Sequence, residues 1–83
     1  MIELQLFSTA GCHLCDLAVE QIKTLPLAAQ ITVDVVEIGD DEMLVEQYGV
    51  RIPVIKFPDQ SELNWPFNQN DILHKIASNY VEL

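Results

Sequence analysis

The hydrophobic pattern changes its period abruptly between residues 8 and 13. Apolar and polar side chains alternate over residues 2–7, which is the period of a β-strand, and residues 8–11 then break the pattern. From Leu14 the apolar positions recur at spacings of three and four residues as far as Pro26, which is the period of an α-helix. The sequence therefore predicts a strand, a tight loop and a helix in succession, with Cys12 and Cys15 at the junction.

The pattern after Pro26 predicts five further elements. Runs rich in β-branched residues predict strands, while acidic residues followed by Gly49 predict a short helix. Asn68 is placed to cap a last helix, with Asp71 three residues further on. The expected elements are strands over 31–38, 54–57 and 62–65, and helices over 40–49 and 68–80.

The order of these elements, β-α-β-α-β-β-α, restricts the topology. A helical crossover joins the first two strands, which should therefore be parallel, whereas a short turn joins the last two into a hairpin. A chain of 83 residues has room for one hydrophobic core but not for a second domain. We therefore predict a single α/β domain over residues 1–83 with a thioredoxin-like fold, in which three helices flank a four-stranded mixed sheet.

The charge balance argues against one class of partner. Thirteen acidic residues against four basic ones give a formal net charge of -9, which is the wrong sign for binding nucleic acid. No apolar run approaches the roughly 18 residues that span a membrane, and the amino terminus lacks the pattern of a signal peptide. We therefore expect a cytoplasmic monomer that binds neither nucleic acid nor a membrane.

The two cysteines are placed for chemistry. Their spacing brings both side chains onto one face of the helix, with β-carbons roughly 5 to 6 Å apart. Cys12 lies at the amino end, where backbone N–H groups and the helix dipole favour a thiolate. Such a pair predicts thiol-disulfide exchange, in which Cys12 attacks a protein or small-molecule disulfide and Cys15 resolves the mixed disulfide. A protonated His13 would stabilise the thiolate, whereas Asp16 would oppose it.

Other uses of the cysteines stay open from the residues alone. The pair could form a structural staple, or both thiols could simply be buried. Cys12, His13 and Cys15 supply at most three ligands for zinc or an iron-sulfur cluster, so a metal carrier would need a partner chain or small thiols. A redox-inactive module that binds an extended peptide is a further alternative. We expect no bound metal and no tightly bound cofactor.

Two segments resemble the glutaredoxin family, and more closely a small bacterial branch described as glutaredoxin-like. Residues 6–15 are similar to the family's first strand and redox motif, and residues 48–54 to the segment that ends in its cis-proline. The resemblance implies a thiol-disulfide oxidoreductase, with glutathione as a candidate co-substrate. It also implies that Pro53 is cis and packs against the redox pair, and that Ile52 offers backbone hydrogen bonds to the substrate. Arg51 would add positive charge and contact a substrate carboxylate.

The chain departs from the family pattern at two places. Residues 64–68 read Asn-Trp-Pro-Phe-Asn where glutaredoxins carry a Gly-Gly pair at the glutathione site, and Thr9 stands where a lysine is frequent. These departures weaken glutathione as the substrate and leave the partner open. Trp65 and Phe67 could line a substrate groove, but an aromatic residue in such a place is more often part of the core.

Overall fold

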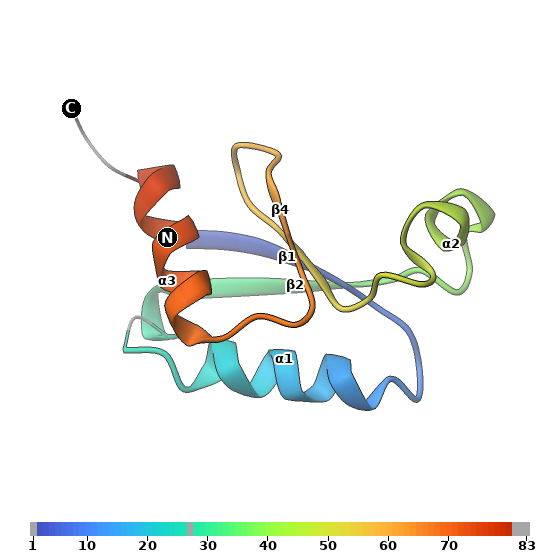
Figure 1. Cartoon of the computed structure of the whole chain (residues 1–83), viewed down its shortest axis with the longest axis horizontal. Coiled ribbons are helices and arrows are strands. Elements are labelled where there is room, and N and C mark those ends of the chain that lie inside the picture. Colours follow the sequence, from blue (N-terminus) through green and yellow to red (C-terminus); the bar gives the residue numbers. More distant parts are fainter. Residues whose placement is uncertain (1, 27, 81–83) are drawn as a thin grey trace.

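The computed structural model describes residues 2–26 and 28–80, and its strands form one four-stranded sheet in the order β2-β1-β3-β4 (Figure 1). The predicted order of elements is confirmed, and a short 3-10 helix, η1, is added before the second strand. The elements are β1 (Ile2–Ser8), α1 (His13–Lys23), η1 (Ala28–Gln30), β2 (Ile31–Glu37), α2 (Glu42–Tyr48), β3 (Val54–Lys56), β4 (Glu62–Asn64) and α3 (Gln69–Tyr80).

The strand register places the ends of β1 and β2 at the same edge of the sheet. These two strands are parallel over their whole length, from Ile2 opposite Ile31 to Ser8 opposite Glu37. β3 is antiparallel both to β1 and to β4, so the predicted parallel pair and the predicted hairpin are confirmed. The sheet is therefore mixed, and the loop that follows β1 begins beside the last residue of β2.

The main core lies between the sheet and the helices α1 and α3 (Figure 1). Leu4 and Leu6 alternate with exposed polar residues along β1 and point toward these helices. Full burial of one such side chain stabilises the fold by about 1.5 to 3 kcal/mol. The face of β1 that carries the apolar side chains is therefore the face that packs against the helices. The helix residues that pack in this core include Ala18, Ile22, Ile72 and Ile76.

A second, smaller core lies on the opposite face of the sheet, under α2. Because successive strand residues point to opposite faces, Phe7 points away from the main core that its neighbour Leu6 enters. Phe7 packs there with Tyr48, Ile38 and Val54. Both faces of the sheet are thus covered at the carboxyl end of β1, where the loop to the cysteines begins.

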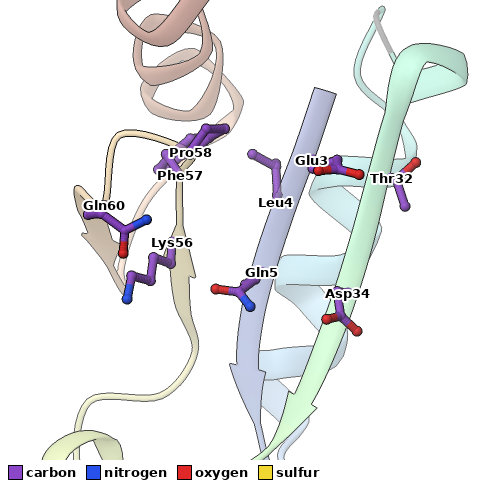
Figure 2. A pocket seen from close by; sticks show the side chains of 9 residues that line it. All are labelled: Glu3, Leu4, Gln5, Thr32, Asp34, Lys56, Phe57, Pro58 and Gln60. Carbon is purple, nitrogen blue, oxygen red and sulfur yellow. The ribbon is translucent and has the colours of Figure 1, made fainter. Parts of the chain in front are cut away.

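The remainder of that second face is open and polar. A hollow of about 300 Å³ lies over the amino-terminal half of β1, toward the opposite end of that strand from Cys12. Figure 2 shows the side chains that line it. The hollow contains neither cysteine. Its lining residues are Glu3, Leu4, Gln5, Thr32, Asp34, Lys56, Phe57, Pro58 and Gln60.

Polar side chains cap both α2 and α3. The Asn68 side chain accepts the Asp71 N–H and the Asp71 carboxylate accepts the Asn68 N–H, both at 2.9 Å, so the predicted cap of α3 is confirmed. Asp41 caps α2 by accepting the N–H groups of Met43 and Leu44. Each cap satisfies backbone donors that the first turn of a helix leaves unpaired.

The two aromatic residues before α3 belong to the packed interior and its margin. Phe67 is 6% exposed and lies in the main core, which confirms the core interpretation for this residue. Trp65 is half-buried and packs edge to face on Phe67, with ring centroids 5.1 Å apart. Both aromatic rings therefore help to seat α3 against the sheet.

Candidate functional site

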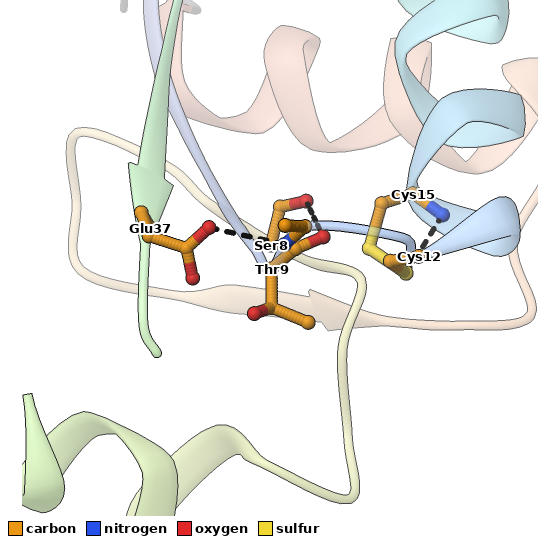
Figure 3. The surroundings of a disulfide bond; sticks show 6 residues. Ser8, Thr9, Cys12, Cys15 and Glu37 are labelled. Atoms are coloured by element: carbon orange, nitrogen blue, oxygen red, sulfur yellow. Dashed lines mark hydrogen bonds between the residues drawn. A yellow bond between two sulfur atoms is a disulfide. The ribbon is translucent and has the colours of Figure 1, made fainter. Parts of the chain in front are cut away.

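Cys12 and Cys15 are joined by a disulfide at the start of α1, with their Cα atoms 5.2 Å apart (Figure 3). Cys12 is the residue that caps the helix, and its Sγ accepts a hydrogen bond of 3.1 Å from the Cys15 N–H. In the reduced protein this N–H and the helix dipole would act on the Cys12 sulfur. Cys12 is half-buried whereas Cys15 is 2% exposed, so Cys12 is the more accessible cysteine of the pair.

The loop before Cys12 is a tight turn held by backbone hydrogen bonds. The Cys12 N–H donates to the Thr9 carbonyl at 3.2 Å, and the Cys12 carbonyl in turn accepts the Asp16 N–H as α1 begins. Gly11 has a φ of +80°, a left-handed conformation that strongly favours glycine. The turn therefore needs glycine immediately before the first cysteine, as the sequence has it.

Glu37, at the end of β2, holds this turn from the side (Figure 3). Its carboxylate accepts the Ala10 N–H at 3.0 Å and the Gly39 N–H at 2.6 Å, and it also accepts the Thr9 hydroxyl. These bonds, with that of Gly39 the strongest, lower the pKa of Glu37 from its usual 4.5. Glu37 was not among the residues predicted for the site. Its register opposite Ser8 is the signal that would have found it.

Pro53 lies at the same end of the sheet as the cysteine loop. Val54 pairs with Phe7, so Pro53 precedes β3 where β1 runs out into the turn. The Ile52–Pro53 peptide bond is cis, the Pro53 side chain is less than 2% exposed, and the Pro53 carbonyl accepts the Trp65 N–H. The half-buried Ile52 donates its N–H to the Tyr48 carbonyl at 3.0 Å, so this N–H is already used within the chain.

Arg51 is held by two side chains of its own chain. Its Nη2 donates to Glu62 at 2.7 Å, and its guanidinium lies over the Tyr48 ring, 4.9 Å from the centroid. The Tyr48 hydroxyl donates to the other Glu62 oxygen at 2.5 Å. That bond most strongly, and the bond and charge of Arg51 beside it, hold the pKa of Glu62 below its usual 4.5. The expected contact of Arg51 with a substrate carboxylate stays a prediction.

The charged residues next to the disulfide face solvent. His13 is the first residue of α1 and Asp16 lies in its first turn, and both are exposed. Their predicted opposite effects on a Cys12 thiolate stay predictions.

Two features are absent from the described stretches of the chain. No group of three or more His, Cys, Asp or Glu side chains is arranged there to hold a metal ion. No helix of these stretches has the length and apolar character needed to cross a membrane.

Comparison with known proteins gives one family and several similar structures. A family model described as Glutaredoxin-like domain (DUF836) matches residues 3–77, and no curated protein matches the chain. A crystal structure of the structural genomics target XcR50 from X. campestris is 35% identical over 90% of this chain and 96% of its own, with a TM-score of 0.76. Its solution structure is 36% identical over 94% and 95%, with a TM-score of 0.78.

A more distant structure supports the fold alone. The N21Q mutant of thioredoxin from Halobacterium salinarum is 22% identical over 99% of this chain and 77% of its own, with a TM-score of 0.72. The predicted thioredoxin-like fold is therefore confirmed.

Proposed function

The chain belongs to the Glutaredoxin-like domain family (DUF836), and on this premise we propose that it is a thiol-disulfide oxidoreductase working through Cys12 and Cys15. The observation that carries the proposal is the placement of the half-buried residue Cys12 at the helix cap, one turn from a buried Cys15. A Cα separation of 5.2 Å falls within the usual range of disulfides, so the two cysteines are spaced to form one.

The reaction begins with the reduced pair. The Cys12 thiolate attacks one sulfur of a substrate disulfide, forms a mixed disulfide and releases the other sulfur as a thiolate. Cys15 then loses its proton and attacks the Cys12 sulfur, which forms the Cys12–Cys15 disulfide and releases the second substrate thiolate. Two electrons pass from the protein to the substrate, and a thiol donor of the cell returns them by the reverse exchange.

The backbone around Cys12 supports its role as the attacking thiol. The Cys15 N–H points at the Cys12 sulfur at 3.1 Å, and the free N–H groups of the first turn give this end of α1 a positive potential. Both stabilise negative charge on sulfur, and cysteines at helix amino ends have pKa values of about 3.5 to 7.5 against about 8.5 for a free thiol. Cys15, buried one turn further on, acts only after the mixed disulfide has formed.

The substrate seat that we propose lies beside Pro53. An extended segment of a protein or small-molecule disulfide would lie along residues 52–53 with its sulfur toward Cys12, because Pro53 enters β3 at the end of the sheet where the cysteine turn begins. Since the Ile52 N–H already donates to the Tyr48 carbonyl, the Ile52 carbonyl would accept a hydrogen bond from the substrate segment. We assign to Arg51 the role of holding residues 51–53 of this chain in place, since its guanidinium contacts both Glu62 and Tyr48.

Single cysteine variants test the assignment of roles. The reduced Cys15→Ser protein, mixed with a neutral disulfide, should accumulate a mixed disulfide on Cys12, because the resolving thiol is missing. The reduced Cys12→Ser protein should accumulate little, since Cys15 is 2% exposed. Mass spectrometry of the intact proteins counts the adducts, and the Cys12→Ser, Cys15→Ser double variant is the control. Equal adduct formation by the two single variants would contradict the assignment.

A further inference from the structure

A carboxylate whose hydrogen-bond partners among the described residues are all uncharged lies next to the turn that presents Cys12. The Glu37 side chain reaches from the end of β2 across the end of β1, as Figure 3 shows, and bonds two residues of this turn. Its hydrogen-bond partners are the Ala10 and Gly39 N–H groups and the Thr9 hydroxyl. None of these carries a charge, so the carboxylate keeps its full negative charge.

The carboxylate lies near enough to Cys12 for its charge to act there. Ala10 precedes Cys12 by two residues, so their Cα atoms are at most about 7.6 Å apart. The Thr9 carbonyl accepts the Cys12 N–H at 3.2 Å, which ties Cys12 to the same turn that Glu37 holds. Charges in water act over about 10 Å at 0.1 M salt but about 30 Å at 0.01 M, so at low salt a charged disulfide that approaches Cys12 lies within the field of Glu37.

Apart from His13, which follows Cys12, the nearby residues supply little positive charge that could offset the charge of Glu37. Arg51, the basic residue nearest in sequence to Pro53, is paired with the Glu62 carboxylate at 2.7 Å. Asp16, exposed in the first turn of α1, adds a second negative charge four residues after Cys12. The formal net charge of -9 means that negative charge predominates in the molecule as a whole.

Building on the redox function proposed above, we propose that Glu37 is a specificity residue of this site. Its carboxylate disfavours anionic disulfides such as oxidised glutathione and favours cationic ones. The same carboxylate positions the turn of residues 9–12, so charge and geometry must be separated in the test. Coulomb's law in water gives an effect of about twofold for each substrate charge at roughly 8 Å, opposite in sign for cations and anions.

Three small disulfides of different charge separate the two effects. The reduced protein is mixed with dicationic cystamine, neutral bis(2-hydroxyethyl) disulfide or dianionic oxidised glutathione, and second-order rate constants are measured at low salt. Each constant is divided by that of the neutral disulfide for the same variant, which cancels changes in thiol reactivity or folding. In Glu37→Gln, which keeps an oxygen acceptor for the Ala10 N–H, the ratio of cystamine to glutathione should fall about fourfold, because the nearer charge of each disulfide contributes about twofold.

A matched control lies further along α1. Glu20 is exposed and eight residues beyond Cys12, about 12 Å along the helix, so Glu20→Gln should change the ratio by less than twofold. Glu37→Ala, which removes charge and acceptor together, should lower the ratio as far as Glu37→Gln does. In 1 M salt the difference between wild type and Glu37→Gln should shrink below twofold.

The outcomes distinguish this inference from the function on which it rests. An unchanged ratio in Glu37→Gln, or an equal fall in Glu20→Gln, would overturn the role of Glu37 while exchange with the neutral disulfide upheld the redox function. Failure of the reduced wild type to react with any of the three disulfides would overturn the redox function itself.

Discussion

The rings of Phe7 and Tyr48 stack face to face, with their centroids 4.2 Å apart and their planes inclined by 9°. Phe7 is the last fully buried residue of β1 before the cysteine turn, and Tyr48 is the last residue of α2. The stack therefore fixes the end of α2 against the strand that leads to Cys12. Through its hydroxyl, Tyr48 also reaches Glu62, which binds Arg51 in the segment before Pro53.

Substitutions of Tyr48 should separate its ring from its hydroxyl. Tyr48→Phe keeps the stack and loses the hydrogen bond to Glu62, so the free energy of unfolding should fall by about 1 kcal/mol. Tyr48→Ala also removes the ring from a core where Tyr48 is 2% exposed, and should cost about 3 to 5 kcal/mol. Unfolding in urea, followed by circular dichroism, measures both. Equal losses in the two variants would show that the ring contributes nothing.

The Arg51–Glu62 pair should contribute a measurable coupling. The two side chains are 38% and 25% exposed, so solvent weakens the pair, and we expect a coupling energy of about 0.5 to 1 kcal/mol. A double-mutant cycle with Arg51→Ala and Glu62→Ala, analysed by urea unfolding at low salt, gives this energy directly. A coupling energy near zero would mean that Arg51 does not hold its segment through Glu62.

The Glu62 carboxylate should make the stability of the fold depend on pH. The Tyr48 hydrogen bond, with the bond and charge of Arg51, holds the pKa of folded Glu62 below 4.5. A carboxyl group whose pKa is lowered by folding stabilises the fold above its unfolded pKa, and this contribution is lost as the pH falls through the folded pKa. The unfolding free energy should therefore decrease below about pH 4.5, and less steeply in Glu62→Gln than in wild type.

Glu46→Gln, on the exposed surface of α2, is the matched control for this pH series. It should follow the wild-type curve, and parallel curves for all three proteins would contradict the role given to Glu62.

The sequence predicts local structure well because the local signals are strong. The change of period at residues 8–13 marks the end of β1 and the start of α1 to within a residue or two. Asn68 and Asp71 form the predicted cap because capping depends on residues three apart in the chain. Phe67 enters the core as expected for a large apolar side chain beside a helix.

The parts that sequence reasoning missed depend on pairings between distant residues. Glu37 reaches Ala10 across 27 positions only because β1 and β2 are in parallel register, and Glu62 meets Arg51 only once the β3–β4 hairpin has formed. Gly49 does end α2 as predicted, but with right-handed dihedral angles. A β-carbon at this position would collide with the Val45 carbonyl oxygen, so the need for glycine arises from that contact.

If the Cys12–Cys15 pair exchanges electrons with cellular thiols, it must come to equilibrium with a thiol buffer of known potential. The protein is equilibrated without oxygen in glutathione buffers of graded potential, its thiols are alkylated, and the oxidised and reduced forms are counted by mass spectrometry. We predict a two-electron transition with a midpoint between roughly -270 and -120 mV, the range of related dithiols. A pair that stays wholly reduced or wholly oxidised from about -300 to -120 mV would contradict thiol-disulfide exchange by Cys12 and Cys15.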